Sequence, residues 1–272
     1  MQYVGMEAPE TLQHAIKGFW YTSIDFGEYP AGFEIIPDGY AEIIFLFGSA
    51  CSVATPGGLQ PLPSPFLMGL LGQPVRLHAQ DSVEVVGIKC FPWVVFELLG
   101  LPAGSGGVQV FEHPIAQLQA PLAALVQAGQ VAEALVLVRQ YFLSTQSAPA
   151  PDQLLAKAGE AMSAARGTLP VHQVAAAAHA TVRTLERKFK QAAGHTVKDV
   201  SGLMRFEQVR NRLWREPMAS LAALAQELGY ADQAHLSRDF KRYCGTTPAA
   251  FARQARRGQQ AVGRDFVAFV QA

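Results

Sequence analysis

The chain contains the stretch LERKFK at residues 185–190 and a second version of it, LSRDFK, at residues 236–241. The two share four of six residues at an offset of 51, and Gly194 and Gly245 follow at the same offset. In each stretch a leucine and a phenylalanine stand four residues apart, so both lie on one helical face, which packs inward. Alanine-rich segments precede both stretches and permit a close, steep helix crossing. Each glycine supplies the left-handed residue that ends a helix. The repeat therefore predicts two helix-turn-helix units.

The opposite face of each second helix is polar. Its residues are Arg183, Glu186, Arg187 and Lys190 in the first unit, and Gln233, Ala234, Ser237, Arg238 and Lys241 in the second. Arginine can bond guanine in two places, glutamine can pair with adenine, and lysine holds phosphates. One such face is more often an exposed helix surface with structural salt bridges. Two faces with arginine and lysine at matching positions favour two DNA-reading helices.

Between the units the sequence predicts a long helix from Val197 to about Trp214, opened by a capping box at Thr196. At 1.5 Å per residue it is about 27 Å long. A rod of this length suits reading helices placed one DNA turn apart, about 34 Å. Its arginines either meet the intervening phosphates or lie on a solvated face: Arg205, Arg210, Arg212 and Arg215.

The charge of the chain divides in the middle. Residues 1–150 carry 4 basic and 12 acidic residues, a net charge of −8, and the rest carries 18 basic and 10 acidic residues, a net charge of +8. A solvated charged surface would explain either value. The positive half is nevertheless the part in which a polyanion such as DNA is expected to bind.

The length of 272 residues is enough for two separate cores. Residues 144–151, STQSAPAP, have the composition of an exposed linker. We expect a β-rich domain for effector binding or dimerisation at 1–150, a DNA-binding domain at 151–257 and a tail at 258–272. The tail either docks on the domain before it or seeds a dimer contact through four apolar residues: Phe266, Val267, Phe269 and Val270.

The first 90 residues predict strands, because short apolar runs alternate with turn signals at spacings near ten residues. The runs cover residues 41–47, 66–70, 75–78 and 83–90. They predict a small sandwich or barrel. Helical periodicity follows at residues 93–99, 115–126 and 131–143, and these helices are expected to cover one side of the sheet. The fold class is therefore α+β, with an all-α C-terminal part.

Cysteine usage and the N-terminal residues point to a reducing compartment. The three cysteines, Cys51, Cys90 and Cys244, are widely spaced and form no Cys-x-x-Cys pair, so neither a disulfide framework nor a thiolate metal site is expected. The first residues lack the features of a signal peptide, and no apolar run approaches the roughly 18 residues of a membrane span. We expect a cytoplasmic protein that has no membrane partner.

Residues 224–241, LAQELGYADQAHLSRDFK, followed by Gly245-Thr246-Thr247-Pro248, resemble the signature of the AraC/XylS family of bacterial transcription regulators. The resemblance spans about residues 152–256 and implies seven helices, of which the third and sixth enter adjacent major grooves. It implies these base-facing residues: Arg183, Glu186, Arg187, Gln233, Ala234, Ser237 and Arg238. Ala234 departs from the polar residue common there, and Glu186 brings a negative charge to the groove unless it accepts a hydrogen bond from cytosine.

The N-terminal half is similar to the sensor-type domains of such regulators, in Phe19-Trp20, Pro37-Asp38-Gly39, residues 43–45 and residues 87–92. That resemblance implies a cupin-like barrel that binds a small effector or dimerises. Five aromatic residues are candidates to line an effector pocket, although strand aromatics usually form core: Trp20, Phe45, Phe47, Phe91 and Trp93. The expected partners are double-stranded promoter DNA, an effector of unknown chemistry, RNA polymerase and a second copy of the chain.

Two other classes of function compete with this interpretation. A metal enzyme in the first half lacks its ligands, because His14, His78 and His113 show no ligand spacing, and Ser105 sits in a glycine-rich loop rather than a nucleophile elbow. A helical protein-interaction module that does not bind DNA would not need the +8 charge. The sequence thus predicts a regulator with no catalytic residue, metal or cofactor, and it leaves activation or repression open.

Overall fold

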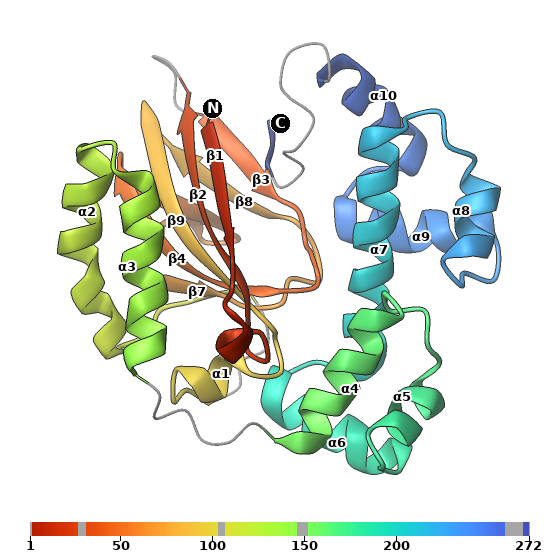
Figure 1. Ribbon diagram of the computed structural model, residues 1–272. Coiled ribbons are helices and arrows are strands. Elements are labelled where there is room, and N and C mark those ends of the chain that lie inside the picture. Colours follow the sequence, from red (N-terminus) through yellow and green to blue (C-terminus); the bar gives the residue numbers. More distant parts are fainter. Residues whose placement is uncertain (1, 27–30, 103–106, 146–151, 259–268, 272) are drawn as a thin grey trace.

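The computed structural model describes residues 2–26, 31–102, 107–145, 152–258 and 269–271. The strand-rich part lies beside the helical part, with α7 running between the sheets and α8 and α9 (Figure 1). Several predicted features lie outside the described residues: Ser105, most of the linker, Phe266 and Val267.

The described strands form two antiparallel sheets. One has the order β1 (Gln2–Glu7), β2 (Ile16–Asp25), β9 (Ser82–Cys90), β4 (Ala41–Gly48), β7 (Phe66–Met68) and β10 (Val108–Gln109). The other has the order β11 (Phe269–Gln271), β3 (Ala31–Ile35), β8 (Val75–Ala79), β5 (Cys51–Thr55) and β6 (Gly58–Pro61). The C-terminal residues 269–271 thus pair with β3, along the edge of the second sheet.

Helices cover the outer face of the six-stranded sheet, as the periodicity predicted (Figure 1). They are α2 (Gln119–Gln127) and α3 (Val131–Ser144), preceded by the short α1 (Val95–Leu98); η1 (Glu10–Leu12) and η2 (Pro114–Leu118) are 3-10 turns. The helix predicted from Ile115 begins as η2 instead. Pro121 explains the change, because it has no N–H to donate to the carbonyl of Gln117 in an α-helix.

Strand β4 shows why the sheet is buried on both faces. Phe45 and Phe47 point toward the covering helices and join the main core, whereas Ile44 points to the second sheet and joins a separate core. Side chains alternate along a strand, so a strand covered on both sides has a nearly continuous apolar sequence. The run predicted at residues 41–47 has this character.

The helical part contains seven helices between residues 152 and 258. They are α4 (Gln153–Ala164), α5 (Val171–Ala177), α6 (Val182–Ala193), α7 (Val197–Arg215), α8 (Leu221–Glu227), α9 (Gln233–Cys244) and α10 (Pro248–Gly258). The capping box predicted at Thr196 is confirmed, with Asp199 as its reciprocal partner at the start of α7. Gly194 and Gly245 end α6 and α9 in the left-handed conformation that the repeat required.

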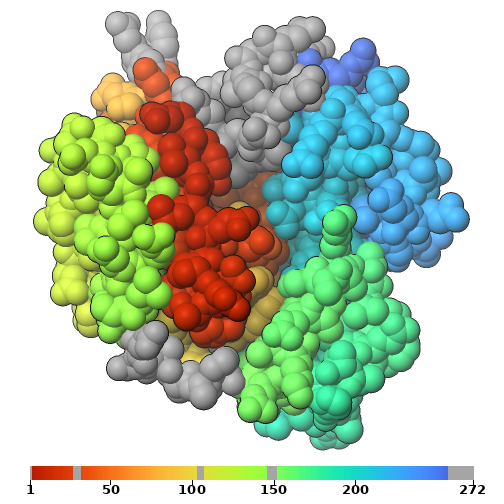
Figure 2. Space-filling view, in the orientation of Figure 1, coloured from red at the N-terminus to blue at the C-terminus, as the bar shows by residue number. Residues whose placement is uncertain are grey.

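The strand part and the helical part share one continuous core. Trp93 lies at their junction, with its ring 5.0 Å from that of Phe91 and 5.7 Å from that of Phe189 on α6. It also fills the space over Gly159 of α4, where a Cβ would come within 2.3 Å of the indole. The first helix-turn-helix unit is therefore held against the strand part through Trp93. Figure 2 shows α4, in green, beside the strand part.

None of the described helices has both the length and the apolar character needed to cross a bilayer. Within the described ranges, no three His, Cys, Asp or Glu side chains are arranged to hold a metal ion. The three cysteines are buried and free, and burial raises the pKa of Cys51 to about 11.

Candidate nucleic-acid interface and effector cavity

Helices α6 and α9, which the sequence predicts to read DNA, expose their polar faces. Leu185 and Phe189 of α6 and Leu236 and Phe240 of α9 are at most 1% exposed. On the opposite faces the exposed residues are Arg183, Arg187, Lys190, Gln233, Ala234, Arg238 and Lys241. Inward packing of the apolar pair thus fixes which side of each helix meets solvent.

Glu186 and Ser237 are half-buried on these faces. The Oε2 atom of Glu186 accepts a hydrogen bond of 3.3 Å from the backbone N–H of Val197. The carboxylate therefore satisfies a free N–H in the first turn of α7. Ser237 occupies the matching position in the second unit, so the two faces differ there in charge.

Two of the four arginines expected either to meet phosphates or to lie on a solvated face are instead turned inward, so both alternatives were wrong for them. Arg205 Nη1 donates to the carbonyl of Gly167 at 2.7 Å, with its guanidinium 5.2 Å from the ring centre of Tyr230. Arg210 is 4% exposed and its Nη1 donates to the carbonyl of Pro37 at 3.1 Å. Helix periodicity alone could not show that one side of α7 faces the strand part. Arg212 and Arg215 are exposed.

A cavity of about 220 Å³ lies between the two sheets and reaches α7. Its inner wall is apolar and is built by Trp20, Phe33, Ile44, Phe66, Met68, Leu71, Leu77 and Val85. The end nearest α7 is polar and includes Asp38, Tyr40, Glu42, Lys89, Glu207, Arg210, Asn211 and Arg215. The cavity thus has the two-part lining of a site for a small amphipathic molecule.

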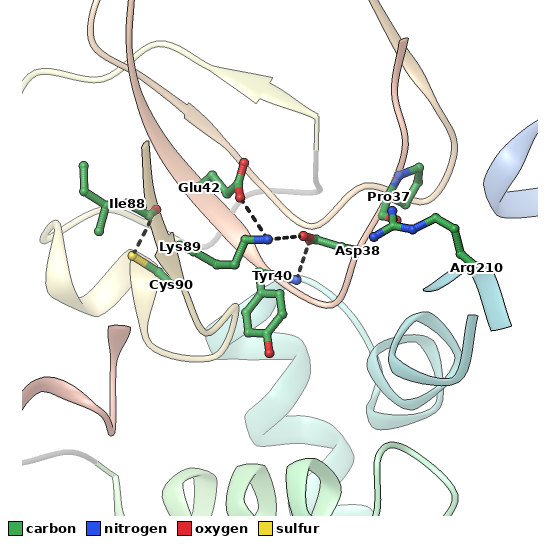
Figure 3. Close-up of polar contacts among 8 residues, drawn as sticks. All are labelled: Pro37, Asp38, Tyr40, Glu42, Ile88, Lys89, Cys90 and Arg210. Carbon is green, nitrogen blue, oxygen red and sulfur yellow. Dashed lines mark hydrogen bonds and ion pairs between the residues drawn. The ribbon is translucent and has the colours of Figure 1, made fainter. Parts of the chain in front are cut away.

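A charged cluster forms the polar end (Figure 3). Lys89 Nζ lies 2.8 Å from Asp38 Oδ2, 3.4 Å from Glu42 Oε1 and 5.1 Å from the ring centre of Tyr40. Glu42 and Lys89 are cross-strand partners of β4 and β9, which brings residues 47 positions apart into contact. The Asp38 carboxylate also accepts from the backbone N–H of Tyr40 at 2.9 Å, which fixes the turn before β4.

Desolvation dominates the electrostatics of this cluster. Burial raises the pKa of Glu42 to about 7, although Lys89 lowers it in part. Burial alone would lower the pKa of Lys89, but Asp38 and Glu42 raise it above its usual value. On α7, burial and then Asp38 raise the pKa of Glu207. One lysine is therefore shared by two carboxylates that have limited access to water.

Of the five aromatic residues predicted for an effector pocket, only Trp20 lines this cavity. Phe45 and Phe47 belong to the core on the other side of β4, and Phe91 and Trp93 stack at the junction with the helical part. The sequence reasoning missed Glu42 and Lys89. Their signal was one charge in β4 and one near the end of the largely apolar β9, both on the face opposite Phe45.

Two protein families match the chain. Residues 174–254 match the family described as "Helix-turn-helix domain", and residues 6–109 match one described as "Domain of unknown function (DUF6597)". A search of curated protein sequences finds no match.

Among solved structures, ToxT from Vibrio cholerae O395 is similar, with a TM-score of 0.50, 10% identity and coverage of 87% of this chain and 98% of that one. ToxT bound to (E)-4-(8-methylnaphthalen-1-yl)but-3-enoic acid matches with a TM-score of 0.50, 9% identity and coverage of 88% and 100%. The DNA-binding domain of AdpA, a global transcriptional factor in complex with a target DNA, matches with a TM-score of 0.37, 23% identity and coverage of 41% and 99%.

The helix-turn-helix family match and the two exposed polar helices identify a DNA-binding transcription regulator with a β-rich N-terminal part. Its helical domain carries two helix-turn-helix units in tandem, as the repeat and the resemblance of residues 224–248 predicted.

Proposed function

We propose that α6 and α9 enter two adjacent major grooves of one promoter duplex. The observation that carries this proposal is the matched exposure of Arg187 and Arg238 on two helices joined by the single rod α7. At 19 residues, α7 is about 28 Å long. That length is compatible with two grooves one turn apart, about 34 Å.

The proposed base contacts follow the exposure of the side chains. We assign base reading to Arg183, Arg187, Gln233, Ala234, Ser237 and Arg238, and phosphate contact to Lys190 and Lys241. Glu186 also lies at the groove. It can accept a hydrogen bond from a cytosine amino group only if its hydrogen bond to Val197 breaks. The first groove should therefore be read mainly by arginines.

The strand part, residues 1–150 with a boundary in the linker, is proposed to be the sensor for this reading domain. Its cavity reaches α7, which joins the two units, so an occupant of the cavity contacts the element that sets their spacing. The structure of ToxT with a bound organic acid supports a small organic effector. We place the regulator in the cytoplasm, where promoter DNA, RNA polymerase and a second copy of the chain are its proposed partners.

Gel-shift titration of the full chain tests the DNA proposal, with the DNA that flanks its own gene at two salt concentrations. Affinity should fall steeply with salt, because phosphate contacts release counterions. Arg238→Ala should cost about 1 to 3 kcal/mol on the cognate site and relax one base preference, and Arg187→Ala should do the same in the other groove. Lys241→Ala should weaken all sequences about equally.

Arg76→Ala is the matched control. Arg76 is an exposed arginine on β8 that pairs with Glu34, and both residues are far in sequence from α6 and α9. It should leave the affinity and the base preference unchanged. Retention of both properties in the Arg187 and Arg238 variants would show that the reading faces are wrongly assigned. An absence of any DNA binding would favour the protein-interaction alternative.

A further inference from the structure

The apolar wall of the cavity is rich in aromatic rings. Trp20, Phe33 and Phe66 lie around its inner space, and Tyr40 stands at the polar end. The volume of about 220 Å³ is below the roughly 300–1,000 Å³ of sites for drug-sized ligands. The space therefore suits a molecule with one ring or a short branched chain.

At the polar end of the cavity, among the side chains that are at least partly buried, acidic ones outnumber basic ones. Three carboxyl groups with limited solvent access line the cavity, those of Asp38, Glu42 and Glu207. Only two cationic side chains with similarly limited access line it, Lys89 and Arg210. Lys89 is shared between Asp38 and Glu42, with the shorter distance to Asp38. Glu42 is 16% exposed, and its second polar partner is the neutral indole N–H of Trp20. When all three carboxyl groups are ionised, one negative charge thus lacks a cation of its own.

We propose that the effector cavity takes a small organic cation, an amine or quaternary ammonium with an apolar ring, whose charge lies beside Glu42 and the Trp20 ring. This inference rests on the proposed role of the cavity as the effector site. A cation against an aromatic face is attracted by the ring quadrupole, and the attraction grows when water is excluded. The carboxylate supplies the counter-charge, and the rings between the sheets bury the apolar body.

An anionic ligand is the competing chemistry. The Nε atom of Arg210 is buried without a partner among the described residues, and the exposed Arg215 lies at the same end. Arg210 is already engaged, however, because its Nη1 bonds Pro37 and its guanidinium lies 5.8 Å from the ring centre of Phe206. An added anion would also join an existing excess of carboxylates. Charge balance therefore favours the cation.

The pH dependence of binding follows from the groups around Glu42. The groups that line the cavity around it are Asp38, Lys89, Tyr3 and Trp20, with Glu207 and Arg210 on α7, and Cys90 lies on the other face of β9. Burial raises the pKa of the Glu42 carboxyl to about 7, so this group is partly protonated at neutral pH. Bound cation favours the ionised carboxylate. Affinity should therefore rise from about pH 6 to about pH 8, because the carboxyl loses its proton over that interval.

Isothermal titration of the full chain tests the proposal with three one-ring probes: benzyltrimethylammonium, phenylacetate and benzyl alcohol. The ammonium should bind tightest, and its charge does not titrate, so any pH dependence belongs to the protein. Glu42→Gln keeps the size and polarity of the side chain and should weaken the ammonium by about tenfold or more, as loss of a partly desolvated charge pair predicts. The same variant should remove the pH dependence.

Glu34→Gln is the matched control, since Glu34 lies on β3 with its side chain on the face opposite Phe33 and pairs with Arg76. It should bind the ammonium as the unchanged chain does. Tighter binding of phenylacetate or benzyl alcohol, or no binding of any probe, overturns the proposal, and the unchanged chain alone suffices for this comparison. If Glu207→Gln weakened binding of the ammonium and Glu42→Gln did not, the assignment to Glu42 would also be overturned. Gel shifts on the same preparations show separately whether the DNA-binding role holds.

Discussion

Replacement of Arg210 by methionine tests whether the strand part and α7 are held together as the structure indicates. The guanidinium is 4% exposed and donates to the Pro37 carbonyl at 3.1 Å. A hydrogen bond from a charged donor contributes about 1.5–3 kcal/mol. Methionine also removes the buried Nε that has no partner, which offsets part of the loss. We therefore expect Arg210→Met to lower the free energy of unfolding by about 1–2 kcal/mol, less than the full value of the bond.

Urea denaturation of the full chain measures this change, with tryptophan fluorescence as the probe. Arg212→Met on the same helix is the control, because Arg212 is 49% exposed and pairs with Glu216 at 3.1 Å. An exposed pair of this spacing contributes about 0.3–0.5 kcal/mol. Equal losses in the two variants, or a gain in Arg210→Met, would refute the view that Arg210 fastens α7 to the strand part.

Three further predictions concern the junction, the central helix and the cavity. Gly159→Ala should destabilise the chain by about 1–3 kcal/mol in urea denaturation, because the new Cβ would meet the ring of Trp93. Asp199→Asn replaces the charged acceptor of the α7 capping box by a neutral one and should cost about 0.3–1 kcal/mol at neutral pH. Burial would raise the pKa of Asp199, but its hydrogen bonds lower it below the usual value. The ionised carboxylate thus adds stability that is present above about pH 4 and lost at lower pH, so the difference between Asp199→Asn and the unchanged chain should shrink in acid denaturation. Gly87→Ala should displace the Trp20 ring, which lies over Gly87, and abolish binding of benzyltrimethylammonium in titration while DNA affinity in gel shifts stays unchanged.

Features that depend on neighbouring residues were predicted well from the sequence. The capping box expected at Thr196 opens α7, since a cap bonds backbone groups two or three residues away. The outward faces of α6 and α9 were predicted for a similar reason. An α-helix has 3.6 residues per turn, so the face opposite Leu185 and Phe189, which point to the core, must be exposed.

The cavity between the two sheets could not be predicted in this way. Phe45 and Ile44 are adjacent aliphatic or aromatic residues of one strand, yet they belong to different cores, and composition alone does not tell which face closes a cavity. The aromatic candidates chosen from the sequence therefore fell mostly in the core and at the junction.

The linear order of the residues was enough to determine the helices, their ends and the two polar reading faces, because these depend on backbone bonds and side chains within a few positions. The direction in which Arg210 points and the meeting of Glu42 with Lys89 depend on the pairing of β4 with β9 and on the docking of α7. Those contacts join segments from 47 to 173 positions apart, and such distances close only when apolar surfaces from the whole chain are buried together.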